Sequence, residues 1–153
     1  MDRKFRCLKE KGFTLIELLI VIAVISILIG IALPRFKGMQ DEGNIAKAKG
    51  ELRTLQTAVE SFYIHNSQAY PATLAALNTA TPSIVTTTPT DPFSSTSAVY
   101  GYTRGGTNNK FYIIFSVGAG GNGSAAISGT DTVTETNGSS CIYASNIGQD
   151  AAP

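Results

Sequence analysis

The 153-residue sequence contains no tryptophan, one histidine and two cysteines, and only 15% of its residues are charged. No histidine–cysteine pair and no pair of carboxylates stands in a setting suited to acid–base chemistry, so we do not expect an enzyme. No basic stripe with interleaved aromatic residues occurs, so composition gives nucleic-acid binding no support. Removal of residues 1–12 would take away Cys7 and leave Cys141 without a disulfide partner in the chain. We interpret Cys141 as a small apolar side chain.

The positive charge is concentrated at the N-terminus. Residues 1–12 carry five Lys and Arg against two Asp and Glu, a net charge of +3. The remaining residues carry seven basic and nine acidic side chains, a net charge of −2. The chain therefore consists of a short basic segment followed by a nearly neutral remainder.

The longest apolar run covers residues 13–33 and contains a single charged side chain, Glu17. A helix of this length is about 30 Å long, which matches the hydrocarbon thickness of a bilayer. Five basic residues precede the run, whereas only Arg35 and Lys37 follow closely. This asymmetry favours a cytoplasmic N-terminus and an exported remainder, residues 34–153. Glu17 is not explained by a plain membrane anchor, and a carboxylate inside an apolar span is a candidate functional group.

The residues around this run form a specific pattern. Lys11-Gly12-Phe13-Thr14-Leu15-Ile16-Glu17, followed by an apolar stretch and Pro34, resembles the class III signal of type IV pilins and type II secretion pseudopilins. The resemblance implies that residues 1–12 are a leader, and that a prepilin peptidase cuts between Gly12 and Phe13 and methylates the new amino group of Phe13. It also implies roles in filament assembly for Glu17 and Pro34. Pro34 supplies no backbone N–H and presses on the carbonyl of Gly30, so it should kink or loosen the helix.

The second part of the chain predicts an α+β domain. Apolar residues recur at intervals of three and four from Ile45 to Tyr63, which extends the helix to about residue 64. Two strand-like segments, 99–104 and 109–117, flank a glycine-containing turn and predict a β-hairpin. The expected fold is therefore pilin-like: a long N-terminal helix, membrane-spanning in its first half, packed through its second half on a small antiparallel sheet formed after residue 98. His65 is expected to cap the helix or to be solvated.

Three loop segments carry further signals. Leu74 and Leu77 predict a short packed turn, and the Asp91-Pro92-Phe93 segment resembles an Asp-Pro-aromatic segment of major pseudopilins. The glycine spacing of Gly118–Gly123 fits a dinucleotide-binding loop, but no helix of adequate length can follow it, so we do not expect a nucleotide site.

Calcium is the one cofactor that the resemblance raises, because major pseudopilins order their C-terminal loop around this ion. Calcium requires several oxygen ligands, usually including carboxylates. Asp131 and Glu135 are the candidate ligands here, but Gly118–Gly123 contains no acidic residue. The favoured interpretation is a loop without metal, with calcium binding as the alternative.

The favoured function is structural: a major pseudopilin that polymerises into a periplasmic filament driving type II protein secretion. A pilin of a surface type IV pilus, serving adhesion, motility or DNA uptake, is the first alternative. The lack of a cysteine pair and the Asp91–Phe93 segment favour the pseudopilin. A membrane-tethered binding module that does not polymerise is disfavoured, because it gives Glu17 and the Gly12–Phe13 junction no role.

The resemblance also implies partners and a location. The partners would be further copies of the chain in a helical homopolymer, the prepilin peptidase, an inner-membrane assembly platform and minor pseudopilins. The chain would cross the inner membrane once, with its N-terminus cytoplasmic before processing. Its mature domain would lie in the periplasm, or at the cell surface in a pilus.

Overall fold

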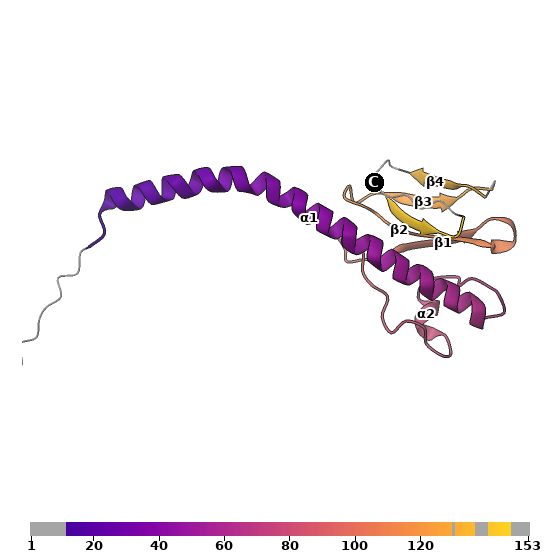
Figure 1. Cartoon of the computed structure of the whole chain (residues 1–153). Coiled ribbons are helices and arrows are strands. Elements are labelled where there is room, and N and C mark those ends of the chain that lie inside the picture. Colours follow the sequence, from indigo (N-terminus) through magenta and orange to yellow (C-terminus); the bar gives the residue numbers. More distant parts are fainter. Residues whose placement is uncertain (1–11, 130, 137–140, 148–153) are drawn as a thin grey trace, which may run out of the picture. The chain divides into compact units, whose positions relative to one another are not determined.

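The computed structural model describes residues 12–129, 131–136 and 141–147 (Figure 1). The chain divides into two compact units, one ending at Met39 and the other beginning at Gln40. Helix α1, Leu15–His65, belongs to both units by sequence. The predicted long helix is confirmed, but it begins at Leu15 and not at residue 13, and it ends at His65. Hydrogen bonds between Thr14 and Glu17 account for the start of the helix at Leu15.

The first unit is an apolar helical segment with exposed side chains. An 18-residue window of α1 has a mean hydropathy of 3.0, and none of this window is buried. By length and composition α1 is able to cross a membrane, and it is the one such helix in the described ranges. Pro34 lies inside α1 without ending it.

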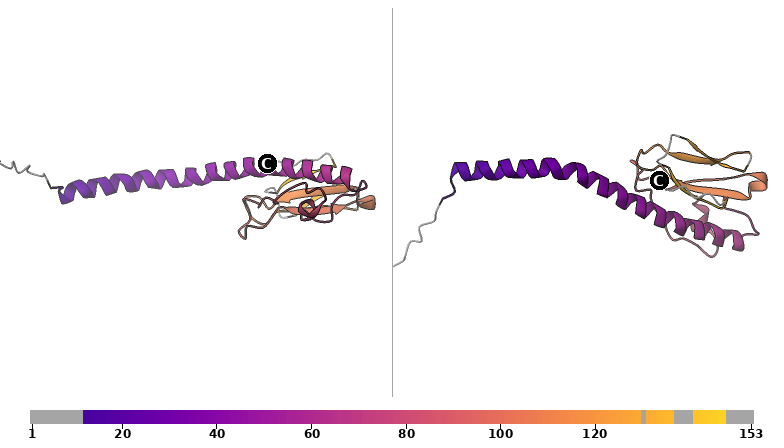
Figure 2. Two further views of the ribbon diagram at one scale, coloured as in Figure 1. Left: turned by 90° about the horizontal axis from the view of Figure 1, so that it is seen from below. Right: turned by 45° about the horizontal axis from the view of Figure 1, so that its top comes forward.

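The second unit contains two antiparallel sheets and short helical turns (Figures 1 and 2). A three-stranded sheet has the order β1-β2-β5, in which β1 is Gly101–Gly105, β2 is Phe111–Ser116 and β5 is Ile142–Ser145. A hairpin of β3, Ser124–Ile127, and β4, Val133–Thr136, forms the second sheet. The remaining elements are α2, Ala76–Thr79, and a 3₁₀ turn, η1, Thr107–Asn109. The α+β class and the β1–β2 hairpin are confirmed, and β3, β4 and β5 add strands that were not individually predicted.

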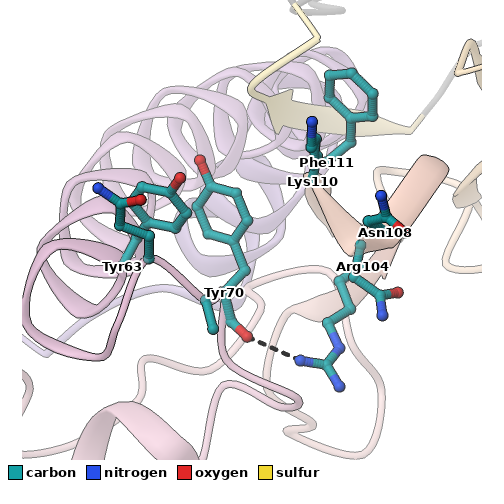
Figure 3. A pocket seen from close by; sticks show the side chains of 9 residues that line it. Tyr63, Tyr70, Arg104, Asn108, Lys110 and Phe111 are labelled. Carbon is teal, nitrogen blue, oxygen red and sulfur yellow. Dashed lines mark hydrogen bonds between the residues drawn. The ribbon is translucent and has the colours of Figure 1, made fainter.

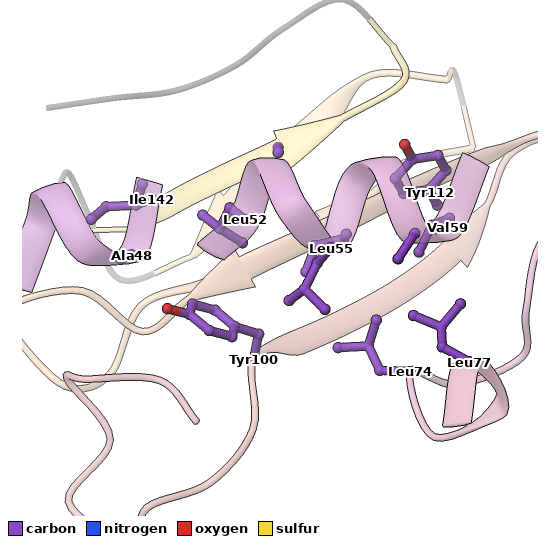
Figure 4. Close-up of a cluster of buried hydrophobic side chains, with 12 residues drawn as sticks. Ala48, Leu52, Leu55, Val59, Leu74, Leu77, Tyr100, Tyr112 and Ile142 are labelled. Carbon is purple, nitrogen blue, oxygen red and sulfur yellow. The ribbon is translucent and has the colours of Figure 1, made fainter. Parts of the chain in front are cut away.

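The larger core lies between the second half of α1 and the three-stranded sheet (Figure 4). Residues of α1 spaced three and four apart face this core, as the apolar stripe predicts, and strand residues and the predicted turn at Leu74 and Leu77 close it. Its buried members include Ala48, Leu52, Leu55, Val59, Leu74, Leu77, Tyr100, Tyr112, Ile114, Ile142 and Ala144. Two phenols reach past this core to carboxylates on α1, since Tyr100 Oη donates to Glu51 Oε2 at 2.6 Å and Tyr112 Oη donates to Glu60 Oε1 at 2.8 Å.

A smaller core lies on the opposite face of the same sheet. Side chains alternate along a strand, so the residues between those facing α1 point the other way. Ile113 of β2 and Tyr143 of β5 are buried there with Cys141 and Ala125. The β3–β4 hairpin covers this face, and the result is a layered arrangement of helix, sheet and hairpin.

Asp91 connects the loop before β1 to the end of β2 through hydrogen bonds. Its carboxylate is almost completely buried and accepts three hydrogen bonds. Oδ1 accepts from Phe93 N at 3.0 Å and Ser116 Oγ at 2.8 Å, and Oδ2 accepts from Val117 N at 2.8 Å. The backbone N of Asp91 donates to Ala98 O at 2.9 Å, which closes the loop. The aspartate of the Asp-Pro-Phe segment is therefore a structural anchor.

Candidate processing and assembly site

The predicted cleavage junction lies outside regular secondary structure and is open to solvent. Gly12, Phe13 and Thr14 precede α1 and are all exposed, and the Phe13 side chain is 81% exposed. A peptidase must draw a substrate into its active site as extended chain, and non-helical backbone with no packed neighbours allows this directly. The geometry at the junction is therefore compatible with the predicted cut.

We expect the mature protein to begin at Phe13 and to carry one added methyl group on its new amino terminus. The reason is the combination of a basic leader, the Gly12–Phe13 junction and its open backbone. Intact-mass measurement on protein purified from the native host checks this. A mature chain that still contains Met1–Gly12, or one cut after residue 33, would contradict the prediction.

Thr14 and Glu17 form a capping box at the start of α1. The Thr14 backbone N donates to Glu17 Oε2 at 2.8 Å, and the Thr14 hydroxyl donates to the same oxygen at 2.7 Å. In return the Glu17 backbone N donates to Thr14 Oγ1 at 3.3 Å. Such reciprocal bonds satisfy donors that the first helical turn leaves without partners. This pair fixes the start of the helix at Leu15.

The same pair determines what the Glu17 carboxylate can do. In the single subunit both bonds to Oε2 come from Thr14, and the carboxylate lies at the end of a long exposed apolar helix. No other acidic residue occurs between Phe13 and Met39. When apolar helices pack against one another, a carboxylate among them needs a hydrogen-bonding or cationic partner. Glu17 is thus the one anionic group on this surface that can select how neighbouring helices align.

The apolar surface of the first unit supplies the packing area. Most of its large side chains are about half exposed or more; Leu15 near its start is 82% exposed and Phe36 near its end is 71% exposed. Gly30 has no side chain and nothing lies within 4 Å of where its Cβ would be. Pro34 follows four residues later and leaves the Gly30 carbonyl without an N–H partner. The structure shows α1 unbroken through this stretch, and loosening of the helix between Gly30 and Pro34 stays a prediction from the sequence.

Asp131 and Glu135, the candidate calcium ligands, lie on the β3–β4 hairpin. Asp131 is in the turn before β4 with a φ of 56°, and its Oδ1 accepts a hydrogen bond from Thr107 N at 3.3 Å. Glu135 is on β4 opposite Ala125. Within residues 12–129, 131–136 and 141–147, no group of three or more His, Cys, Asp or Glu side chains could hold a metal ion. The observed role of Asp131 is to bind the turn after β1.

We expect the melting temperature of the second unit to be the same with calcium and with a chelator. A site filled at 100 times its dissociation constant would stabilise the protein by about 2.7 kcal/mol. Near-ultraviolet circular dichroism of tyrosine in the detergent-solubilised chain measures this. A rise in melting temperature that Asp131→Asn removes would instead establish calcium binding.

Cys141 and His65 are the one cysteine and the one histidine among the residues that the structure describes. Cys141 is buried and free. Burial, reinforced by the charges of Glu135 and Asp91, raises the pKa of its thiol to about 11. The thiol therefore stays protonated near neutral pH. His65, the last residue of α1, is exposed, and its Nδ1 lies 2.7 Å from Ser61 O, which agrees with a helix-end role.

The glycine-rich loop is followed by a strand. Its turn is closed by a bond from Gly123 N to Val117 O at 2.9 Å, and β3 begins at Ser124. A phosphate-binding glycine loop depends on the N-terminus of a following helix. The sequence predicts that no such helix follows the loop, and the structure has β3 in this place.

Two family descriptions match the chain. The prokaryotic N-terminal methylation motif matches residues 7–33. Type II secretion system protein G matches residues 35–135, which is more than half of the chain. The first match contains the cleavage junction, Glu17 and Gly30, and the second contains most of the second unit.

Individual relatives come from both pili and secretion systems. The chain is 51% identical over 57 residues to the fimbrial protein EcpB of Eikenella corrodens, covering 37% of this chain and 36% of that protein. It is 47% identical over 55 residues to the type IV major pilin protein PilA of Myxococcus xanthus, covering 36% and 25%. It is 30% identical over 69 residues to the type II secretion system core protein G of Pseudomonas aeruginosa, covering 45% and 48%. The matches thus span a quarter to a half of these relatives, and no solved structure matches significantly.

Proposed function

Because the chain belongs to the type IV pilin-like family, with a prepilin methylation motif followed by a type II secretion protein G domain, we propose that it is the major subunit of a secretion pseudopilus. The filament would lie in the periplasm and would act in the export of folded proteins. The chain would enter the inner membrane through the apolar part of α1, be cut by the prepilin peptidase, and be added to the filament by a membrane assembly platform. Minor pseudopilins would accompany it.

The observation that best supports polymerisation is the position of the Glu17 carboxylate at the start of an exposed apolar helix. A helix that serves only as an anchor needs apolar surface and gains nothing from an acidic group within it. A helix that must pack at one stagger against copies of itself gains a point of registry from such a group. The capping bonds from Thr14 hold this group in place until a neighbour arrives.

Two observations support the secretion filament over the surface pilus. The protein G description covers residues 35–135, whereas the pilin relatives named above match over 55–57 residues in all. The buried Asp91 gives the Asp-Pro-Phe segment a definite structural role in this domain. The surface pilus remains the second candidate, because the chain is 51% and 47% identical over the matched residues to a fimbrial protein and a type IV pilin.

Deletion of the gene in its native host distinguishes the two functions. The expected result is that folded exoproteins disappear from the culture supernatant while surface pili and surface motility persist. A plasmid copy should restore secretion. Loss of surface pili or motility with an unchanged supernatant proteome would overturn the secretion assignment in favour of the pilus.

A further inference from the structure

A pocket of about 650 Å³ lies at the C-terminal end of α1. The last turn of the helix and the chain after it line one side, and the β1–β2 turn lines the other. Figure 3 shows Tyr63 and Tyr70 on one side, with Arg104, Asn108, Lys110 and Phe111 across from them. Its volume is in the range of pockets that bind small ligands. The pocket is far along the sequence from the processing junction, and the proposed filament function does not use it. Its lining residues are Tyr63, Gln68, Ala69, Tyr70, Arg104, Asn108, Asn109, Lys110 and Phe111.

One wall of the pocket is aromatic and held in position. The rings of Tyr63 and Tyr70 stack with centroids 4.5 Å apart, and the Tyr70 ring lies 4.8 Å from that of Tyr112. Both Tyr70 Oη and Tyr112 Oη donate to the Glu60 carboxylate, at 3.3 Å to Oε2 and 2.8 Å to Oε1 respectively. Asn146 Nδ2 donates to Tyr70 Oη at 3.2 Å. A ligand with a flat apolar face would therefore meet a wall that needs no rearrangement.

The opposite wall carries two cations. Arg104 Nη1 donates to Tyr70 O at 2.9 Å, which orients its guanidinium and leaves further N–H groups for a ligand. The ammonium of Lys110 has no hydrogen-bond or ion-pair partner among the described residues, while its backbone O is held by Asn146 Nδ2 at 3.0 Å. Two carboxylates lie close by without lining the pocket: Glu60 accepts from the two phenols, and Asp131 Oδ1 accepts from Thr107 N at 3.3 Å. A negatively charged ligand could therefore bind to two cationic side chains here, and the lining contains no acidic residue.

Three side-chain amides complete the lining: Gln68, Asn108 and Asn109. None of these amides makes a side-chain hydrogen bond within the described part of the chain. All three residues have left-handed backbone, with φ of 58°, 61° and 55°. Asparagine tolerates this conformation, but glutamine rarely adopts it. Each amide offers both donors and an acceptor, a combination that matches sugar hydroxyls.

We propose that this pocket binds an acidic sugar, such as a uronic-acid unit of an acidic polysaccharide. The aromatic wall would stack on the apolar face of the sugar ring, Arg104 and Lys110 would bind its carboxylate, and the amides would bind its hydroxyls. Inorganic phosphate would use the cations and could accept from the amide N–H groups, but it has no apolar face to lie on the rings. An acidic peptide could use the cations and the amides, but polyglutamate has no apolar ring face to lie on the tyrosines. The acidic sugar is the ligand that uses every part of the lining.

Isothermal titration of the full chain tests this proposal, in a polyoxyethylene detergent that carries no sugar headgroup. The probes are trigalacturonate, a neutral galactose trisaccharide, hexaglutamate and inorganic phosphate. We expect trigalacturonate to bind and the other three to bind at least about tenfold more weakly. Arg104→Gln with Lys110→Gln should weaken trigalacturonate binding by about tenfold or more. Lys110→Gln alone should weaken it without changing the melting temperature, because that side chain supports no other group.

A matched control separates the pocket from overall charge. Lys49→Gln with Arg53→Gln removes the same two charges from α1 outside the lining, and binding should stay within about twofold of the original. Equal losses in the pocket and control variants would show unspecific charge attraction and overturn the proposal. So would the absence of trigalacturonate binding, or equally tight binding of hexaglutamate or phosphate. None of these outcomes bears on filament assembly, which is tested separately.

Discussion

Replacement of Glu17 by valine is expected to abolish filament assembly while leaving membrane insertion and cleavage intact. Valine removes the single acidic group from the apolar span, so insertion should be at least as efficient as in the original chain. The cut after Gly12 should persist, since the junction lies outside the helix. After the cut, Phe13 carries an α-ammonium group. Family resemblance predicts that this group, on a neighbouring subunit, is the partner of Glu17.

The measurement is shearing and fractionation of cells in which the variant is the only subunit, with cross-linking of the membrane fraction. Sheared filaments should fall by about tenfold or more, because apolar packing alone does not fix the axial stagger, whereas a buried pair of the Glu17 carboxylate and the Phe13 ammonium would. Thr14→Val is the matched control, since it removes the side-chain part of the capping box and retains the carboxylate. We expect this control to assemble.

Normal filament yield from Glu17→Val would refute the registry argument. If Thr14→Val failed to the same extent, the role of Glu17 would be to cap the helix, and no partner on a neighbouring subunit would be required. The two variants together therefore separate a local effect on α1 from an effect between subunits.

Asp91→Ala is expected to destabilise the second unit by about 3 kcal/mol. The change leaves Phe93 N, Ser116 Oγ and Val117 N without their acceptor, and a buried donor without a partner costs about 1–3 kcal/mol. Pulse proteolysis of the detergent-solubilised chain in urea measures the free energy of unfolding. Asp91→Asn keeps one accepting oxygen and should lose less.

The control for this prediction is Glu42→Ala, which removes one carboxylate from an exposed position on α1. Its effect should stay within about 0.5 kcal/mol. A loss of less than about 1 kcal/mol for Asp91→Ala would mean that water or a rearranged loop satisfies the three donors.

The parts of the fold with long local signals were predictable. The apolar run and the spacing from Ile45 to Tyr63 determine α1, and the apolar segment Phe111–Phe115 after a glycine turn determines the β1–β2 hairpin. In contrast, β5 has only four residues and pairs with β2 across a long loop, and such distant pairing leaves no periodic signal. The residues of β3 are small, and their role depends on the hydrophobic face that they cover.

The site was predictable only in part. Gly12, Phe13, Glu17 and Pro34 follow from a pattern of residues, but the bonds that hold Glu17 do not. The spacing of Thr14 and Glu17 is a capping-box signal, but the same two residues also belong to the processing signal. The pocket beside Tyr70 could not be predicted, because its lining comes from two segments that only the fold brings together.

The position of β5 in the sheet has a consequence for biogenesis. Ile142 and Ala144 complete the core against α1, although α1 is synthesised first and β5 follows every other described strand. Until β5 pairs with β2, the apolar stripe of α1 stays partly uncovered and the domain cannot close. The polypeptide is therefore expected to pass through most of its translocation as an unfolded chain. If the domain is exported as proposed, the late strand would delay folding until nearly the whole domain has left the cytoplasm.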